Sequence, residues 1–123
     1  MSEKESLPVI LAVDDATIFV RTLKTMLRNS PYELHCASSA EEALEYLQGN
    51  DPSIILLDIV MPDMDGYELA REIKSMGKTA PIIFITANST MDDMNKAAEV
   101  GAVGFLMKPL RLSELHAKLE EFS

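Results

Sequence analysis

Five polar residues stand directly after short apolar segments of the chain, and their types could together carry out phosphate chemistry. Three are carboxylates, one is a hydroxyl and one is an ammonium group: Asp14, Asp15, Asp58, Thr86 and Lys108. Clustered carboxylates repel one another, and a cation usually holds them together. Oxygen ligands alone, few in number on a partly open rim, favour Mg²⁺ that keeps several of its waters. A hydroxyl and an ammonium beside such an ion can hold a phosphate-sized anion.

Each of these residues also has an ordinary structural role when it is considered alone. Either aspartate of the pair Asp14-Asp15 could cap a helix, and Asp58 could be an acid of an ordinary turn. Thr86 could close a strand, and Lys108 could be a solvated charge. The combination, at one edge of a sheet, favours a functional site over these separate roles.

The segments that precede these polar residues are short, continuous and rich in β-branched side chains. They predict strands at residues 9–13, 54–57 and 82–85 that are buried on both faces, as in a parallel sheet. Weaker strand patterns occur at 32–37 and 104–107. Amphipathic helical patterns follow each strand, near residues 19–27, 40–47, 69–76, 94–98 and 112–122. Repeated strand–helix order predicts an α/β fold with right-handed crossovers and helices on both faces of the sheet.

Capping signals and prolines mark where the helices begin and where the functional edge lies. Three residues are followed three positions later by an acid, at capping-box spacing: Ser39 with Glu42, Asp65 with Glu68, and Ser89 with Asp92. Four prolines precede strands, whereas Pro62 and Pro109 follow strands near Asp58 and Lys108. Ligands of open α/β sheets bind at the carboxyl ends of the strands. These two prolines therefore indicate the functional edge.

Length and charge limit the class of protein and its partners. The 123 residues fit one domain over residues 1–123, with its core at about residues 8–122. With 20 acidic and 11 basic residues the net charge is -9, which argues against a nucleic-acid or membrane partner. Cys36 is the single cysteine and cannot form an internal disulfide. With no signal peptide or transmembrane pattern, this predicts a cytoplasmic location.

Over residues 8–122 the chain resembles the receiver domains of response regulators in two-component signalling. Five motifs in the family's order carry the resemblance: Val13-Asp14-Asp15, residues 56–62 (LLDIVMP), Asp65-Gly66, Ile85-Thr86-Ala87 and Lys108-Pro109. Each motif is weak alone, and the five together are specific. The resemblance implies a flavodoxin-like, doubly wound sheet of five parallel strands in the order 2-1-3-4-5, with five helices.

The resemblance also implies a phospho-acceptor and a metal site. Asp58 would take a phosphoryl group from a phosphohistidine on a histidine kinase or a histidine phosphotransfer protein. Asp15 and Asp58 would bind Mg²⁺ directly, and Mn²⁺ could substitute for it. Asp14 would bind largely through water, and the backbone carbonyl of Val60 would be a further ligand.

The remaining roles implied by the resemblance concern the phosphoryl group and a switch. Thr86 would hydrogen-bond one phosphoryl oxygen, Lys108 would pair with another, and the amide of Ala87 would be an extra donor. Phe105 would turn inward as Thr86 moves and change the surface of the fourth helix, fifth strand and fifth helix. An output domain or a downstream protein would bind there. A homodimer that forms on phosphorylation is also consistent with the family.

Two positions in this family flank the route of the water that hydrolyses the acyl phosphate. In this chain they are Val60 and Asn88. Because the side chain of Val60 is apolar and cannot orient a water molecule, we expect slow self-dephosphorylation.

Three other functions compete with a phospho-accepting receiver. A dehalogenase-type phosphotransferase needs an acid two residues after its nucleophile, where this chain has Val60. A nucleotide or flavin binder needs a phosphate-binding loop after the first strand, where Asp14 and Asp15 stand. A degenerate receiver would act only as a protein docking module, but every chemical position is filled.

We therefore expect a domain that catalyses its own phosphorylation and dephosphorylation and turns over no separate substrate. A single-domain shuttle and a receiver from a longer regulator or hybrid kinase both fit the sequence.

Overall fold

The computed structural model describes residues 7–87 and 90–122, in which strands and helices alternate along the chain. The strands are β1 (Val9–Val13), β2 (Glu33–Ala37), β3 (Ile54–Asp58), β4 (Ile82–Thr86) and β5 (Gly104–Met107). The helices are α1 (Thr17–Leu27), α2 (Ala40–Leu47), α3 (Gly66–Ser75), α4 (Met91–Glu99) and α5 (Leu112–Glu121). None of the helices in these two ranges is long and apolar enough to cross a bilayer.

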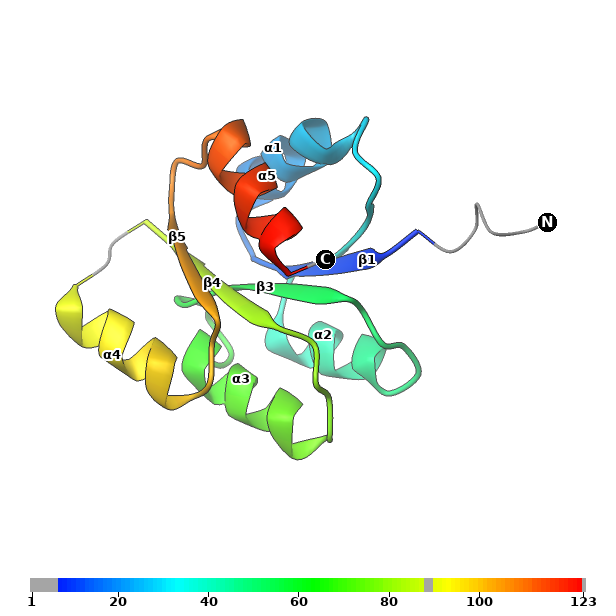
Figure 1. Ribbon diagram of the computed structural model, residues 1–123. Helices are drawn as coiled ribbons and strands as arrows, with labels where there is room; N and C mark the ends of the chain where they lie inside the picture. Colours follow the sequence, from blue (N-terminus) through cyan, green and yellow to red (C-terminus); the bar gives the residue numbers. More distant parts are fainter. Residues whose placement is uncertain (1–6, 88–89, 123) are drawn as a thin grey trace.

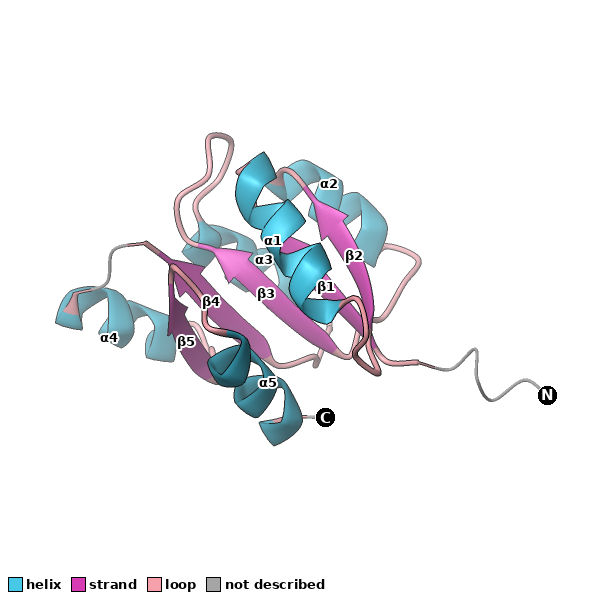
Figure 2. Ribbon diagram, turned by 90° about the horizontal axis from the view of Figure 1, so that it is seen from above, coloured by secondary structure: helices cyan, strands magenta, loops and turns pink. Residues whose placement is uncertain are grey.

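The strands form one parallel sheet in the order β2-β1-β3-β4-β5, which confirms the predicted doubly wound fold. The chain winds from β1 outward to β2, then crosses back to β3 and continues to β5. Figure 2 shows that all strands point the same way. Their carboxyl ends therefore lie along one edge of the sheet, as the candidate site requires.

Helices cover both faces of this sheet, with α1 and α5 on one face and α2, α3 and α4 on the other (Figure 1). Strand β1 shows why its sequence is continuously apolar. Ile10 and Ala12 pack in the core beneath α1 and α5, whereas Leu11 and Val13 pack in the core beneath the other three helices. Burying each Ile or Leu side chain contributes about 1.5–3 kcal/mol, so both cores stabilise the sheet.

Strands β3 and β4 each extend one residue beyond the predicted strands, to Asp58 and Thr86. Asp58 pairs with Ile85 in the register of β3 and β4, and Thr86 pairs with Met107 of β5. Both polar side chains are thus attached to the ordered sheet and not to a loop. Backbone attachment of this kind fixes their positions more closely than loop residues would be fixed.

Helix α4 begins one residue later than the capping pattern predicts. The predicted cap, Ser89, lies outside the described residues, and the cap is Thr90, whose hydroxyl accepts the N–H of Asp93 at 3.1 Å. The Asp93 carboxylate accepts the N–H of Thr90 at 3.2 Å, which completes a capping box. Asp93 and not Asp92 closes this box with its Oδ2, and its Oδ1 accepts a hydrogen bond from the Tyr67 hydroxyl. The other two predicted caps are confirmed: Ser39 for α2 and Asp65 for α3.

Candidate functional site

Polar burial within the described ranges is concentrated at the carboxyl edge of the sheet. Asp14 follows β1 and is 2% exposed, while Asp58 and Thr86 end β3 and β4 and are 7% and 3% exposed. Within residues 7–87 and 90–122, Asp14, Asp58 and Thr86 are the polar or charged residues that are buried. Because burying a charge is costly unless it is compensated, this edge needs nearby counter-charges or a bound cation.

Asp14, Asp15 and Asp58 come together as the sequence predicts. Each offers one carboxylate oxygen, and these oxygens lie within 4.8 Å of one another. Oδ1 of Asp14 accepts the N–H of Ala16 at 2.8 Å, which fixes the orientation of that carboxylate. Asp15 is exposed, so the cluster is open to solvent on one side. An oxygen-only, partly open site of this kind fits a hard divalent cation such as Mg²⁺.

Lys108 reaches into this cluster from the segment after β5. Its Nζ lies 2.8 Å from Oδ2 of Asp14 and 3.9 Å from Oδ2 of Asp58. Oδ2 of Asp14 accepts no hydrogen bond of normal geometry from the described residues, so its contact with Lys108 is mainly one of charge. The backbone N–H of Lys108 donates to the carbonyl of Thr86 at 2.8 Å, and the Lys108–Pro109 peptide bond is cis.

Asp58 belongs to the cluster of three aspartates, and its surroundings clearly shift its pKa. Burial, and next to it the neighbouring charge of Asp14, raise the pKa of Asp58 to about 6. The ammonium of Lys108 and a 3.4 Å hydrogen bond from the N–H of Val60 oppose this pKa increase only in part. Asp58 therefore lacks enough positive charge around it, and a divalent cation would supply what is missing.

The turn between β3 and α3 lies closely under Asp58. The N–H of Gly66 donates to the carbonyl of Ile59 at 2.8 Å. A β-carbon on Gly66 would lie 2.5 Å from the carbonyl oxygen of Asp58, closer than any real side chain approaches. Asp63, in the same turn, accepts hydrogen bonds from two N–H groups at the start of α2. The turn that carries Val60 is thus held to two neighbouring elements.

We expect Gly66→Ala to destabilise the protein by roughly 1–3 kcal/mol, because the added methyl group must displace the backbone of Asp58. Urea unfolding monitored by circular dichroism measures this change. The matched control is Gly49→Ala, since a β-carbon at Gly49 meets no atom within 4 Å. Equal stability of the two variants would contradict the close packing of this turn.

Thr86, Ala87 and Phe105 lie on or directly after the neighbouring strands β4 and β5. Thr86 is buried at the end of β4, and Ala87 is exposed next to it. Phe105 of β5 is half-buried and pairs with Phe84 of β4. Asn88, the second predicted lifetime position, lies outside the described residues. The side chain of Val60 is 72% exposed at the rim of the site.

Two aromatic residues that the sequence reasoning did not single out make specific contacts, one with a site residue and one between two helices. Phe19 of α1 places its ring 4.2 Å from Nζ of Lys108. The Tyr67 hydroxyl donates to Oδ1 of Asp93 at 3.0 Å, which joins α3 to the start of α4. Burial raises the pKa of Tyr67 above its ordinary value, and the hydrogen bond to Asp93 raises it further. In the sequence, a position for Phe19 near the site is indicated only by its place four residues after Asp15, in the first turn of α1.

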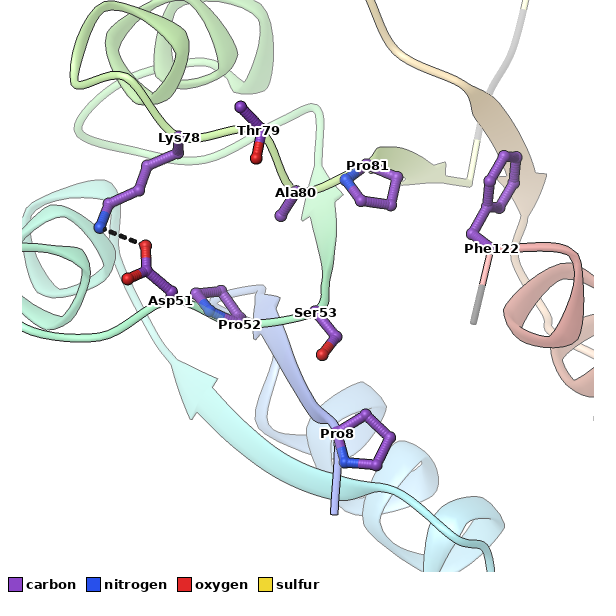
Figure 3. Close-up of a pocket in the computed structure, with 9 residues that line it drawn as sticks. All are labelled: Pro8, Asp51, Pro52, Ser53, Lys78, Thr79, Ala80, Pro81 and Phe122. Carbon is purple, nitrogen blue, oxygen red and sulfur yellow. Dashed lines mark hydrogen bonds and ion pairs between the residues drawn. The ribbon is translucent and has the colours of Figure 1, made fainter. Parts of the chain in front are cut away.

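A cavity of about 460 Å³ lies at the opposite edge of the sheet, far from these residues. Figure 3 shows its lining, in which prolines precede three strands and Phe122 lies to one side. Lys78 and Asp51 form an ion pair of 2.8 Å within it. The charges of this cavity are thus already paired, and no cluster of carboxylates occurs there among the described residues.

Comparison with known proteins agrees with this geometry. A family model described as the response regulator receiver domain matches residues 10–120. Response regulator MprA of Mycobacterium sp. (strain KMS) is 34% identical over 110 residues, which are 89% of this chain and 48% of that protein. Sensor histidine kinase RcsC of Salmonella typhi is 35% identical over 115 residues, or 94% of this chain and 12% of the kinase. The chain thus spans about half the length of the first of these relatives and a small part of the second.

Solved structures show the same fold. A receiver domain protein described as CheY-like, from Methanospirillum hungatei JF-1, has a TM-score of 0.88 at 30% identity. That match covers 94% of this chain and 93% of the other. Chemotaxis protein CheY4 of Vibrio cholerae has a TM-score of 0.90 at 28% identity, over 96% of this chain and 100% of its own. The similarity extends over the whole sheet and all its covering helices.

Proposed function

The chain belongs to the response regulator receiver domains, and from that premise we propose that it accepts a phosphoryl group on Asp58. The observation that carries the proposal is the surroundings of Asp58. It is buried at the end of β3, with oxygens of Asp14 and Asp15 within 4.8 Å. The ammonium of Lys108 lies 3.9 Å from its carboxylate. A nucleophile, a cation site and a fixed positive charge thus share one edge of the sheet.

In the proposed reaction, a carboxylate oxygen of Asp58 attacks the phosphorus of a phosphohistidine on a histidine kinase or histidine phosphotransfer protein. The new O–P bond forms as the P–N bond breaks, and the imidazole nitrogen leaves with the electron pair. Phosphoryl transfer depends mainly on positioning and on neutralising charge. Lys108 pairs with one phosphoryl oxygen, the Thr86 hydroxyl donates to a second, and the Ala87 amide is a further donor.

The metal site in this proposal uses the same carboxylates. Asp15 and Asp58 would bind a divalent cation directly, Asp14 would bind it largely through water, and the carbonyl of Val60 would be a further ligand. Mg²⁺ is the expected ion and Mn²⁺ can replace it, because both prefer oxygen ligands. When bound, the ion neutralises charge on the transferring phosphoryl group. Its requirement is supported by the raised pKa of Asp58 in the metal-free site.

The proposed output is a change in the surface formed by α4, β5 and α5. A phosphoryl group adds about two negative charges and three acceptor oxygens. Thr86 moves toward it, and Phe105 turns inward. Phe105 borders a hollow of about 250 Å³ against α4, which supports such a movement. Exposed apolar side chains on this surface suit an output domain, a downstream protein or a second copy of the phosphorylated chain: Met94, Met107 and Leu112.

We further propose that residues 1–123 form one domain, with its core at about residues 8–122, which works in the cytoplasm. It turns over no separate substrate, and its net charge of -9 opposes direct contact with nucleic acid. Because its relatives include both a response regulator and a sensor histidine kinase, the same domain is suited to either kind of protein.

The alternative is a degenerate receiver that acts only as a docking module, and one experiment separates the two. The full chain is incubated with Mg²⁺ and a small acyl phosphate, and its intact mass is measured. Addition of one phosphoryl group that requires the divalent ion supports the proposal. A folded protein that takes up none supports the docking module.

We expect Val60→Asn to shorten the lifetime of the acyl phosphate severalfold. The exposed valine offers no hydrogen bond to an attacking water, whereas asparagine can orient one. The measurement is the decay of the phosphorylated protein after the donor is removed. Val103→Asn makes the same chemical change at another exposed valine, at the far end of β5, and should leave the decay unchanged. Equal or slower decay in Val60→Asn would show that Val60 does not control the lifetime.

A further inference from the structure

The ammonium of Lys108 is enclosed by three groups, and one of them carries no charge. The carboxylates of Asp14 and Asp58 lie 2.8 and 3.9 Å from Nζ. The ring centroid of Phe19 lies 4.2 Å from the same atom. The side chain of Lys108 is only 18% exposed, so these three groups largely replace its water.

The contact with Phe19 has the geometry of a cation–π interaction. The face of an aromatic ring carries partial negative charge and attracts an ammonium within about 6 Å, most strongly where water is excluded. Phe19 is half-buried and packs against the apolar core beneath α1 and α5. The ring is therefore held by the core while its face is turned to Lys108.

The three neighbours of Lys108 differ in what the proposed reaction does to them. Asp58 becomes an acyl phosphate, and Asp14 would become a neighbour of the cation that the site takes up. Both carboxylates therefore change their attraction for the ammonium as the reaction proceeds. The ring of Phe19 keeps the same charge distribution throughout, so it can hold Nζ within reach of Asp58 while the other contacts change.

We propose that Phe19 is a positioning residue that aims Lys108 at the phosphoryl group on Asp58 through the face of its ring. This inference rests on the proposed function of Asp58. A residue that served only to fill the core would need apolar volume alone. A residue that positions Lys108 must also present ring electrons, and this difference can be measured.

The experiment varies the ring electrons at nearly constant shape. Phenylalanine with one, two or three ring fluorines is incorporated at position 19 of the full chain by codon suppression. The rate of phosphorylation by a small acyl phosphate with Mg²⁺ is then measured. Each fluorine weakens the cation–π attraction, so we expect a stepwise fall that reaches about tenfold with three. A constant rate across the series would overturn the proposal.

Two controls separate positioning from packing. The same fluorinated residues at Phe122, which packs in the same core and is not the ring under the Lys108 ammonium, should leave the rate unchanged. In Lys108→Met, which keeps the chain length and removes the charge, fluorination at position 19 should no longer alter the residual rate. A fall of equal size in either control would overturn the role of Phe19.

Phosphorylation of the unmodified protein distinguishes failure of this inference from failure of the proposed function. If the unmodified protein takes up no phosphoryl group, the role of Asp58 is wrong, and the inference falls with it. If the unmodified protein is phosphorylated on Asp58 and fluorination of Phe19 has no effect, only the inference is wrong.

Discussion

Replacing Asp58 with asparagine is expected to abolish phosphoryl uptake, with a loss of about 100-fold or more in the rate of labelling. The side chain keeps nearly the same shape, but its neutral amide is a poor nucleophile. The measurement is the intact mass of the full chain after incubation with Mg²⁺ and a small acyl phosphate. Peptide mapping of the labelled wild-type protein then locates the acyl phosphate.

The matched control for this prediction is Asp92→Asn. Asp92 is an exposed acid of α4 and forms an ion pair of 3.6 Å with Lys96 on the same helix. Such surface pairs contribute little to stability, so this variant should fold and be labelled like the wild type. Labelling of Asp58→Asn at the wild-type rate, or wild-type labelling that needs no divalent ion, would contradict the proposed chemistry.

The same substitution is expected to stabilise the metal-free protein at neutral pH, by up to about 3 kcal/mol. Burial and the charge of Asp14 raise the pKa of Asp58 from 3.8 to about 6 in the folded state. Between these pH values the folded protein holds a proton that the unfolded chain has released. The free energy of unfolding therefore falls as the pH rises from about 4 to about 6, and asparagine removes this loss.

The measurement is urea unfolding of both proteins with a chelator present, at several pH values from 4 to 7.5. The other carboxylates titrate in both proteins, so the difference in stability isolates Asp58. That difference should grow as the pH rises toward 6 and then stay constant. A difference that is independent of pH would show that Asp58 has an ordinary pKa in the folded state.

Adding Mg²⁺ should stabilise the wild-type protein more than Asp58→Asn. A cation that binds only the folded state stabilises it by an amount that rises with the logarithm of its concentration relative to its Kd. Wild type should therefore gain stability near pH 7, while Asp58→Asn, which lacks one of the three carboxylates, should gain much less. Asp92→Asn should respond to Mg²⁺ like the wild type.

The sequence predicted the main residues of the site because its regularities are local. Continuous apolar strands that end in polar residues indicate a parallel sheet, and parallel strands bring those ends to one edge. The parallel order of the strands therefore predicts that Asp14, Asp58 and Lys108 lie together at one edge of the sheet. Their separations in the chain did not matter, since the sheet order fixes which strand ends are neighbours.

What the sequence could not predict depends on side-chain directions and on contacts between distant segments. The ring of Phe19 has the spacing of an ordinary core residue of a helix, and only the structure shows its face turned to Lys108. The hydrogen bond between Tyr67 and Asp93 links two helices, 26 residues apart. The same contact is made by the acid that closes the capping box of α4.

The prediction for the start of α4 was wrong because two overlapping patterns satisfy the same rule. Ser89 with Asp92 and Thr90 with Asp93 have identical spacing. Local spacing cannot choose between them. The tertiary contact from Tyr67 stabilises the second arrangement, which shows how a small error in a boundary arises from a long-range interaction.

The cavity of about 460 Å³ at the amino edge of the sheet has a consequence for protein engineering. The loops that border it, before β3 and before β4, contribute no carboxylate, hydroxyl or ammonium to the candidate site. A fluorophore or a small inserted domain in these loops would report on the molecule from the side opposite to the chemistry. The parallel arrangement of the strands thus gives this domain one edge for signalling and a second edge that is open to redesign.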